Sequence, residues 1–174
     1  MKFYWLLFIV ITLFCFSCKD KSDSDFENLP KTNTETNIDQ AFEQIVKNDN
    51  LPIDSLAKYI QPLATLFTDD NISKEEAEKW YQKFIHHFEQ QKNEAAIGQI
   101  NRAIGNALCN EYNFDTGIPY LMKSSENFLK AKEYKALSKS YNNLSLAYHD
   151  FGDYVKGIEY ANLALKTVNE NPNS

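Results

Sequence analysis

Three histidines are the residues of this sequence best suited to bind a metal ion or to move protons near neutral pH. His86 and His87 are adjacent, and His149 stands far downstream of both. Neighbouring side chains on a helix point in different directions, so His86 and His87 are not expected to hold one ion together. No second ligand stands at a useful spacing from His149. The sequence therefore predicts no metal site.

The thiol of Cys109 and the adjacent carboxylates of Glu75 and Glu76 are the other groups that could act in catalysis. Cys109 has no histidine or other base near it in sequence, so we interpret it as a small buried residue. Glu75 and Glu76 have a structural explanation, because negative charge near a helix start interacts favourably with the helix dipole. Glycine-rich phosphate loops, nucleophile elbows and zinc-protease motifs are absent from the sequence. We expect no enzymatic activity and no cofactor.

Composition and charge narrow the fold and the partners. The formal net charge is −6, so there is no excess of basic side chains to neutralise the phosphates of a nucleic acid, and no nucleic acid partner is expected. The chain has 12 Phe and 10 Tyr but only five Gly and five Pro. This balance favours packed helices over a turn-rich β architecture, and predicts an all-α fold.

The N-terminus reads as a targeting signal. A positive start at Met1 and Lys2 is followed by an apolar run to Phe16, about 14 residues long, and then by Ser17 and Cys18. A helix needs about 20 apolar residues to cross the hydrocarbon layer, so a permanent membrane span is the weaker alternative. The sequence FCFSC resembles a bacterial lipoprotein cleavage site. That resemblance implies a signal peptide over residues 1–17 and a lipidated Cys18 that carries fatty acyl chains such as palmitate.

Residues 18–37 are polar and charged, and such a stretch cannot bury enough surface to offset its ordering entropy. We expect a flexible tether that joins the acylated Cys18 to a folded domain over residues 38–174. Asp20, Asp23 and Asp25 resemble the acidic signals that send some lipoproteins to the cell surface, although a solvated linker would look the same. The implied location is the bacterial cell envelope, on a membrane, at either the periplasmic face or the cell surface.

A spacing of 40 residues organises the rest of the chain. Ala77, Gly117 and Gly157 are 40 positions apart and all small, while Ile104 and Leu144 match in the same way. Self-similarity at a fixed period of this size is the signature of helical repeat proteins. Each unit would pair two helices, and the small residues would let their backbones approach closely.

The segment 138–172 carries the most complete version of this pattern. Its marker residues stand on a first helix, at a turn, along a second helix and after it: Leu144, Ser145, Tyr148, Gly152, Tyr154, Gly157, Ala161, Ala164 and Pro172. This set resembles the tetratricopeptide repeat (TPR) family. The resemblance implies a short right-handed superhelix of antiparallel helix hairpins, a TPR-like solenoid with repeats of about 40 residues.

Two earlier segments fit the same pattern less well. The unit 98–137 has Tyr112 where the turn glycine normally stands, and Asn101 where a large apolar residue is expected. The unit 54–93 is degenerate, because Pro62 should kink or restart its first helix. Its second helix should begin after Ser73, which has a glutamate three residues later as in a capping box. A short helix near residues 39–46 is expected to cover the open end.

The resemblance also indicates a binding surface, because the first helices of the units line the inner face of a TPR superhelix. The side chains implied to point toward a bound protein or peptide in this concave groove are Gln99, Arg102, Asn106, Lys139, Asn142, Asn143 and His149. Arg102, Asn106 and Asn143 fall on positions that in some family members hold a peptide's C-terminal carboxylate. A different protein ligand and an ordinary solvated polar face are the alternatives.

The resulting hypothesis is a membrane-anchored TPR module for protein–protein interaction, acting as scaffold or assembly partner in the bacterial cell envelope. The alternative is the N-terminal sensor or interaction part of a larger signalling or effector enzyme whose catalytic domain is not in this chain. Self-association is a further expectation. No polar capping helix follows the last hairpin, so an apolar face with Tyr160 and Leu163 would be left uncovered.

Overall fold

The computed structural model describes residues 33–48 and 51–172, and these residues form seven α-helices and no strand. The helices are α2 (Asn33–Lys47), α3 (Ile53–Leu66), α4 (Lys74–Gln90), α5 (Glu94–Asn110), α6 (Phe114–Ala131), α7 (Tyr134–Phe151) and α8 (Tyr154–Glu170). The predicted all-α class is confirmed. Cys18, the signal peptide over residues 1–17 and most of the tether lie outside the described residues, and α2 begins within the last part of the stretch expected to be tether.

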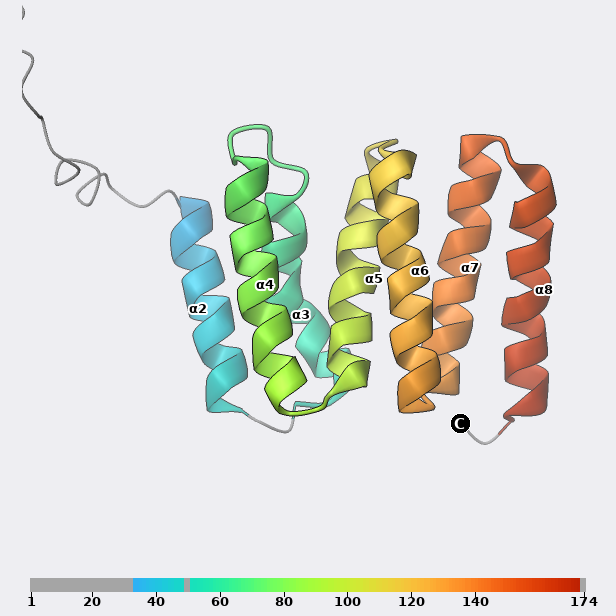
Figure 1. The fold of residues 1–174 in the computed structure, drawn as a ribbon, viewed down its shortest axis with the longest axis horizontal. Coiled ribbons are helices and arrows are strands. Elements are labelled where there is room, and N and C mark those ends of the chain that lie inside the picture. The colour runs from blue at the N-terminus through green and yellow to red at the C-terminus, as the bar shows by residue number, and fades with distance from the viewer. Residues whose placement is uncertain (1–32, 49–50, 173–174) are drawn as a thin grey trace, which may run out of the picture. The chain divides into compact units, whose positions relative to one another are not determined.

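The helices pack mainly against their neighbours in the chain. The pairs α5–α6, α7–α8 and α6–α7 make the most extensive contacts, and α3 also packs on α5. Figure 1 shows α2 at one end of this row of helices and α8 at the other, with α3 behind α4 in this view. Helices α4, α6 and α8 begin at Lys74, Phe114 and Tyr154, each 40 residues after the last, and α5 and α7 begin at Glu94 and Tyr134 with the same spacing.

Local signals in the sequence explain where several helices begin and end. The Ser73 hydroxyl accepts a hydrogen bond from the Glu76 amide at 3.1 Å, and the Asp153 carboxylate accepts one from the Lys156 amide at 3.1 Å. Both are N-caps, which satisfy amides that lack a partner in the first turn. Helix α7 ends at Gly152 in the left-handed conformation, with φ of 94°. The helix start expected after Ser73 and the turn expected at Gly152 are confirmed.

Pro62 behaves differently from the expectation. Helix α3 runs without interruption from Ile53 to Leu66 with Pro62 inside it, so the predicted restart does not occur. A proline removes the hydrogen bond to the carbonyl four residues earlier, here that of Lys58. Lys58 is exposed, so water can replace the missing donor. The buried side of the helix, with Ile60 and Leu63, keeps its packing.

The apolar core is unevenly distributed along the unit. One large cluster joins buried side chains of α2, α3, α4 and α5, with Phe84, Ile60 and Ile104 fully buried at its centre. Two smaller clusters, one around Leu144 and one around Phe128, hold the C-terminal helices together. The N-terminal end is closed by α2, which turns Ile38 and Ile45 inward and polar side chains outward.

Asn101, which stands where the repeat pattern predicted a large apolar residue, takes part in a chain of hydrogen bonds. Its side-chain oxygen accepts from the Tyr81 hydroxyl at 3.0 Å, and its amide donates to Asn127 at 3.2 Å. Asn127 in turn donates to Glu94 at 2.7 Å. Asn101 is 2% exposed, so every one of these bonds offsets a cost of burying a polar group. The chain links α4, α5 and α6.

Candidate interaction groove

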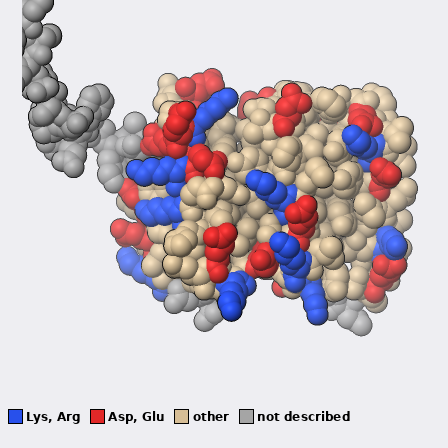
Figure 2. All heavy atoms as spheres, in the orientation of Figure 1, with Lys and Arg blue, Asp and Glu red and all other residues tan. Residues whose placement is uncertain are grey.

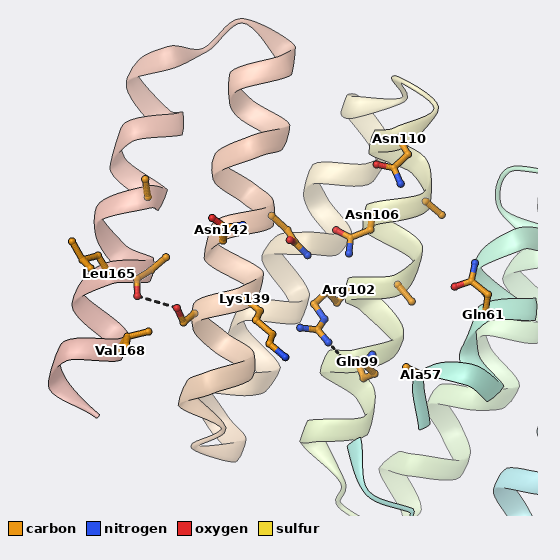
Figure 3. Close-up of a pocket in the computed structure, with 16 residues that line it drawn as sticks. Ala57, Gln61, Gln99, Arg102, Asn106, Asn110, Lys139, Asn142, Leu165 and Val168 are labelled. Atoms are coloured by element: carbon orange, nitrogen blue, oxygen red, sulfur yellow. Dashed lines mark hydrogen bonds between the residues drawn. The ribbon is translucent and has the colours of Figure 1, made fainter. Parts of the chain in front are cut away.

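A groove of about 770 Å³ runs across α3, α5, α7 and α8. Six of the seven side chains predicted to face a partner line it: Gln99, Arg102, Asn106, Lys139, Asn142 and Asn143. Figure 3 shows the α5 residues on one side, the α7 residues next to them, and α8 beyond α7. The six predicted residues in the groove are up to 44 positions apart in the sequence, from Gln99 to Asn143.

Helical spacing explains the polar face of α5. Gln99, Arg102, Asn106 and Asn110 follow one another at intervals of three and four residues, which places them on one side of the helix. The opposite side carries the apolar residues that enter the large core cluster. Because α5 is fixed by that core, the polar row is held at the groove without depending on loops.

Arg102 is held in place by two contacts. Its guanidinium donates a hydrogen bond to the side-chain oxygen of Gln99 and lies over the ring of Phe128, 5.5 Å from the ring centre. Burial lowers the pKa of Arg102 from its ordinary value, and the nearby carboxylate of Asp54 opposes part of this effect. An arginine remains cationic under any such shift near neutral pH. The groove therefore contains a fixed positive charge.

Lys139, Asn142 and Asn143 supply the α7 side of the groove. Lys139 is exposed, and in Figure 3 it extends into the space between α5 and α7 toward Arg102. Leu146 lies one helical turn further along, at three and four residues from Asn143 and Asn142, and 55% of it is exposed. The polar face of α7 thus continues into an exposed apolar residue.

Helix α8 forms an apolar wall that the sequence did not reveal. Ala161, Ala164, Leu165 and Val168 line the groove from this side. The wall is tied to α7 by the Ser138 hydroxyl, which donates to the Ala164 carbonyl at 3.0 Å. Ala57 and Gln61 of α3 line the far end and were also missed. The apolar spacing from Ala161 to Leu165 and Val168 was the available signal.

The charge of the groove is opposite in sign to that of the whole protein. Arg102 and Lys139 are cationic, and none of the described residues that line the groove is acidic. The chain as a whole has a formal net charge of −6. On the face seen in Figure 2, basic and acidic side chains are interspersed. The groove is therefore a local site where an anionic group would be attracted and an apolar one could be buried.

His149 lies outside this groove, in contrast to its expected neighbours. Its ring nitrogen is 3.0 Å from the Asp150 carboxylate, and the ring packs edge-on against Tyr154 at 5.3 Å. His149 has the helical spacing expected of a groove residue. It stands in the last turn of α7, however, and its ring packs against Tyr154 at the start of α8. Of the predicted set, it is the residue that the structure separates from the others.

The histidines and the cysteine considered for metal binding or catalysis do not come together in a common site. Among the described residues, no three His, Cys, Asp or Glu side chains come together as metal ligands would. His86 and His87 each contact a glutamine one turn later, Gln90 and Gln91. Burial, with a contribution from Asp150, raises the pKa of the Cys109 thiol to about 11.

Within residues 33–48 and 51–172, the helices lack the combination of length and apolar character needed to cross a bilayer. Comparison of the chain with protein-family models, with curated proteins and with solved structures finds no match.

Proposed function

We propose that this protein is an interaction module that binds a segment of another protein in the groove between α5, α7 and α8. The observation that carries the proposal is the lining of the groove. Helices α5 and α7 supply the cations Arg102 and Lys139 together with carboxamide side chains, and α8 supplies an apolar wall. Such a surface fits a peptide that presents a carboxylate, from an acidic residue or a free C-terminus, next to an aliphatic side chain.

The same proposal includes the finer fold and the location. The 40-residue spacing of helix starts and the packing of chain neighbours support a short TPR-like solenoid of antiparallel helix hairpins, in which the groove is the concave face. Acylation at Cys18 would hold the module on a membrane of the bacterial cell envelope, where it serves as scaffold or assembly partner. Cys18 is outside the described residues, so this part rests on the sequence.

Each side of the groove has a distinct task in the proposal. Arg102 is already oriented by Gln99 and Phe128, so it loses little side-chain freedom when it pairs with a carboxylate. Asn106, Asn142 and Asn143 can both donate to and accept from a peptide backbone. Leu165 and Val168 are 62% and 51% exposed, so an aliphatic ligand side chain would remove apolar surface from water on both partners.

A peptide-binding experiment tests the proposal. The full chain in detergent micelles is titrated into fluorescent peptides of equal length. One peptide contains an internal Leu-Asp and another ends in a Leu with a free carboxylate. The controls contain Leu-Asn or an amidated C-terminus instead. We expect measurable binding of the carboxylate peptides and a loss of about tenfold or more on neutralisation, because a charge-assisted hydrogen bond in a partly buried site contributes more than about 1.4 kcal/mol.

Matched variants separate the groove from general electrostatics. Arg102→Gln with Lys139→Gln should abolish the preference for carboxylate peptides. Lys79→Gln with Lys130→Gln changes the net charge equally at exposed positions outside the groove and should leave the preference intact. Equal loss in both double variants, or equal binding of charged and amidated peptides, would refute a carboxylate-binding groove.

The anchor has its own test. Cys18→Ala should abolish labelling by a radioactive or alkyne-tagged fatty acid in bacterial cells and release the protein from membranes. Continued membrane association of the variant would show that the apolar stretch ending at Phe16 is retained as a span.

A further inference from the structure

Helix α8 exposes a row of aliphatic side chains, two of which, Leu165 and Val168, also line the groove, so that a contact along the whole row and a peptide in the groove would exclude each other. Val155, Ile158, Leu165 and Val168 are 77%, 65%, 62% and 51% exposed. They follow at intervals of three or seven residues, which aligns them along the helix over roughly 20 Å. A continuous exposed apolar row of this kind marks an interaction surface more often than scattered single residues do.

Part of the same row is covered in α6, which begins 40 residues earlier. The positions that correspond to Ile158 and Val168 are Ile118 and Phe128, which are 9% and 0% exposed because neighbouring helices pack on them, whereas Asp115, which corresponds to Val155, is exposed. In α8 no described helix follows. The row on α8 therefore has the composition of a surface that another helix covers, but this chain's described residues leave it open.

Helix α2, at the opposite end of the unit, is not suited to cover the aliphatic row of α8 in a second copy. Helix α2 turns exposed polar residues outward, among them Gln40, Glu43 and Gln44. A head-to-tail stack of copies would place the aliphatic row of α8 against these polar groups, which would lose water without gaining partners. A second copy can bury the row without covering these polar groups if two α8 helices face each other.

The spacing of the row suits such a two-fold contact. If two α8 helices run antiparallel and are centred between Ala161 and Asn162, Ile158 of each copy lies level with Leu165 of the other. Val155 likewise lies level with Val168 of the second copy. Small Ala161 at the centre lets the helices approach closely. The row is therefore symmetric about its own midpoint, as an isologous interface requires.

The charges beside the row are complementary in the same arrangement. Glu159 and Lys166 lie on one flank of the row and are both exposed. In the antiparallel pair, Glu159 of one copy falls about 3 Å along the axis from the level of Lys166 of the other, and the reverse pair forms by symmetry. Lys166 pairs within its own helix with Glu170 at 3.8 Å, an exposed contact that is easily exchanged. The charges favour the antiparallel register over a parallel one.

We infer that the protein forms a two-fold dimer in which the α8 helices of two copies pack antiparallel through Val155, Ile158, Ala161, Leu165 and Val168. The proposed contact uses other residues than the sequence-based expectation, because Tyr160 stacks on Tyr148 at 5.4 Å, while Leu163, which is 40% exposed as expected, lies on the other side of the helix. A single 17-residue helix offers a contact face of about 25 by 10 Å, well below the area of a standard stable interface. The dimer is therefore weak and depends on concentration.

Sedimentation of the full chain in detergent micelles tests the dimer. We expect a monomer–dimer equilibrium, which Ile158→Lys weakens by about tenfold or more because a charge must leave water in the contact. Leu163→Lys, the same change on the opposite side of α8, should leave the equilibrium unchanged. A wild-type protein that stays monomeric at the highest concentration reached, or an equal effect of both variants, would overturn the inference.

The register has a separate test. The variant Ala161→Cys should form a disulfide-linked dimer under mild oxidation, because residue 161 of one copy lies close to residue 161 of the other at the two-fold axis. Val155→Cys should not, since its two copies lie about 20 Å apart along the helices. Mass spectrometry of the linked peptide distinguishes these products from any that involve Cys15, Cys18 or Cys109. Linkage through position 155 rather than 161 would contradict the antiparallel arrangement.

Charge exchange completes the test. Glu159→Lys alone should weaken the dimer, and adding Lys166→Glu should restore it, because the exchanged charges again face opposite charges of the second copy. If the double variant dimerises no better than Glu159→Lys, a second copy is not the occupant of the row.

Discussion

The helix pairs α5–α6 and α7–α8 share the same 40-residue spacing, yet they differ in how closely their helices approach. A Cβ atom added to Gly117 would lie 2.6 Å from the Cys109 sulfur and 3.0 Å from the Gly105 carbonyl oxygen. A Cβ atom on Gly157 would meet the Ser145 carbonyl oxygen at 3.3 Å. The first pair is packed backbone to backbone, whereas the second has room for a methyl group with a small adjustment.

The two pairs also differ in what lies beyond them. Helix α6 is covered by α7, while the corresponding face of α8 is exposed. In the second pair the Ser145 hydroxyl donates to the Gly157 carbonyl at 2.8 Å, so a side chain bridges a gap that glycines close in the first pair. Similar residues at positions 40 apart therefore place the helices in the same way in both pairs. The contribution of each side chain to stability depends on which neighbouring helices cover it.

The largest difference should appear at the matched isoleucines of α6 and α8. Ile118→Ala is expected to lower the free energy of unfolding by about 3 kcal/mol, because it empties a buried site that cannot fully collapse. Ile158→Ala should cost less than about 0.5 kcal/mol, since that side chain is mostly in water already. Urea unfolding of the full chain in micelles, at a concentration that keeps it monomeric, measures both. Equal losses would mean that α8 is covered within the monomer.

The matched glycines should differ next. Gly117→Ala is expected to destabilise the protein by about 2 kcal/mol, because the added methyl group must push α5 and α6 apart. Gly157→Ala should be close to neutral, since alanine's better helix propensity, about 1 kcal/mol, offsets a mild contact. The same unfolding measurement applies. A neutral Gly117→Ala would show that α5 and α6 separate easily.

Close packing of α5 on α6 should also protect Cys109. Its pKa of about 11 leaves a thiolate fraction at pH 8 that is about 100-fold below that of a free thiol, and only part of the loss is recovered by greater nucleophilicity. Alkylation by iodoacetamide, followed on the Cys109 peptide, should be slower by about tenfold or more in the native protein than in urea. A similar rate in both would place the thiol in solvent.

The same shift affects stability at high pH. A thiol whose pKa is raised by folding stabilises the native state fully below its ordinary pKa, and this contribution is lost as the pH rises through about 11. Alkaline conditions should therefore weaken the contact at Cys109 before they affect the exposed α8 face. Cys109→Ala should remove this part of the pH dependence, which urea unfolding between neutral and alkaline pH would measure.

The smallest expected effect concerns the matched turns. Tyr112 adopts a left-handed conformation with φ of 60°, at the position where the later pair has Gly152 with φ of 94°. Tyr112→Gly should stabilise the protein by about 0.5 kcal/mol, because relief of backbone strain exceeds the loss of an exposed ring contact with Phe114. Gly152→Ala should destabilise it by about 1 kcal/mol. Opposite signs in thermal unfolding would confirm that both turns need the same backbone conformation.

The fold class and the starts of α4 and α8 could be predicted because their signals are local. Apolar spacing defines one buried side of a helix, and caps such as Ser73 and Asp153 mark where it begins. The continuous helix through Pro62 could not be predicted, because it depends on the exposure of the carbonyl that loses its donor. Buried Asn101 was unexpected for a similar reason, since its partner Tyr81 comes from a different helix.

The groove was predictable on its polar side only. Helical spacing brings Gln99, Arg102 and Asn106 to one side of α5, and the 40-residue spacing brings Lys139 and its neighbours to the corresponding side of α7. Spacing does not say which helix stands opposite, so the wall formed by α8 was missed. It also does not give the direction of a side chain near a helix end, which is why His149 was assigned to the groove.

The groove is lined at its two ends by α3 and α8, which pack on α5 and α7 respectively and make no extensive contact with each other. Any occupant long enough to reach both would link two helices that otherwise contact different neighbours. The length of that occupant, as well as its chemistry, would then govern how tightly it is held.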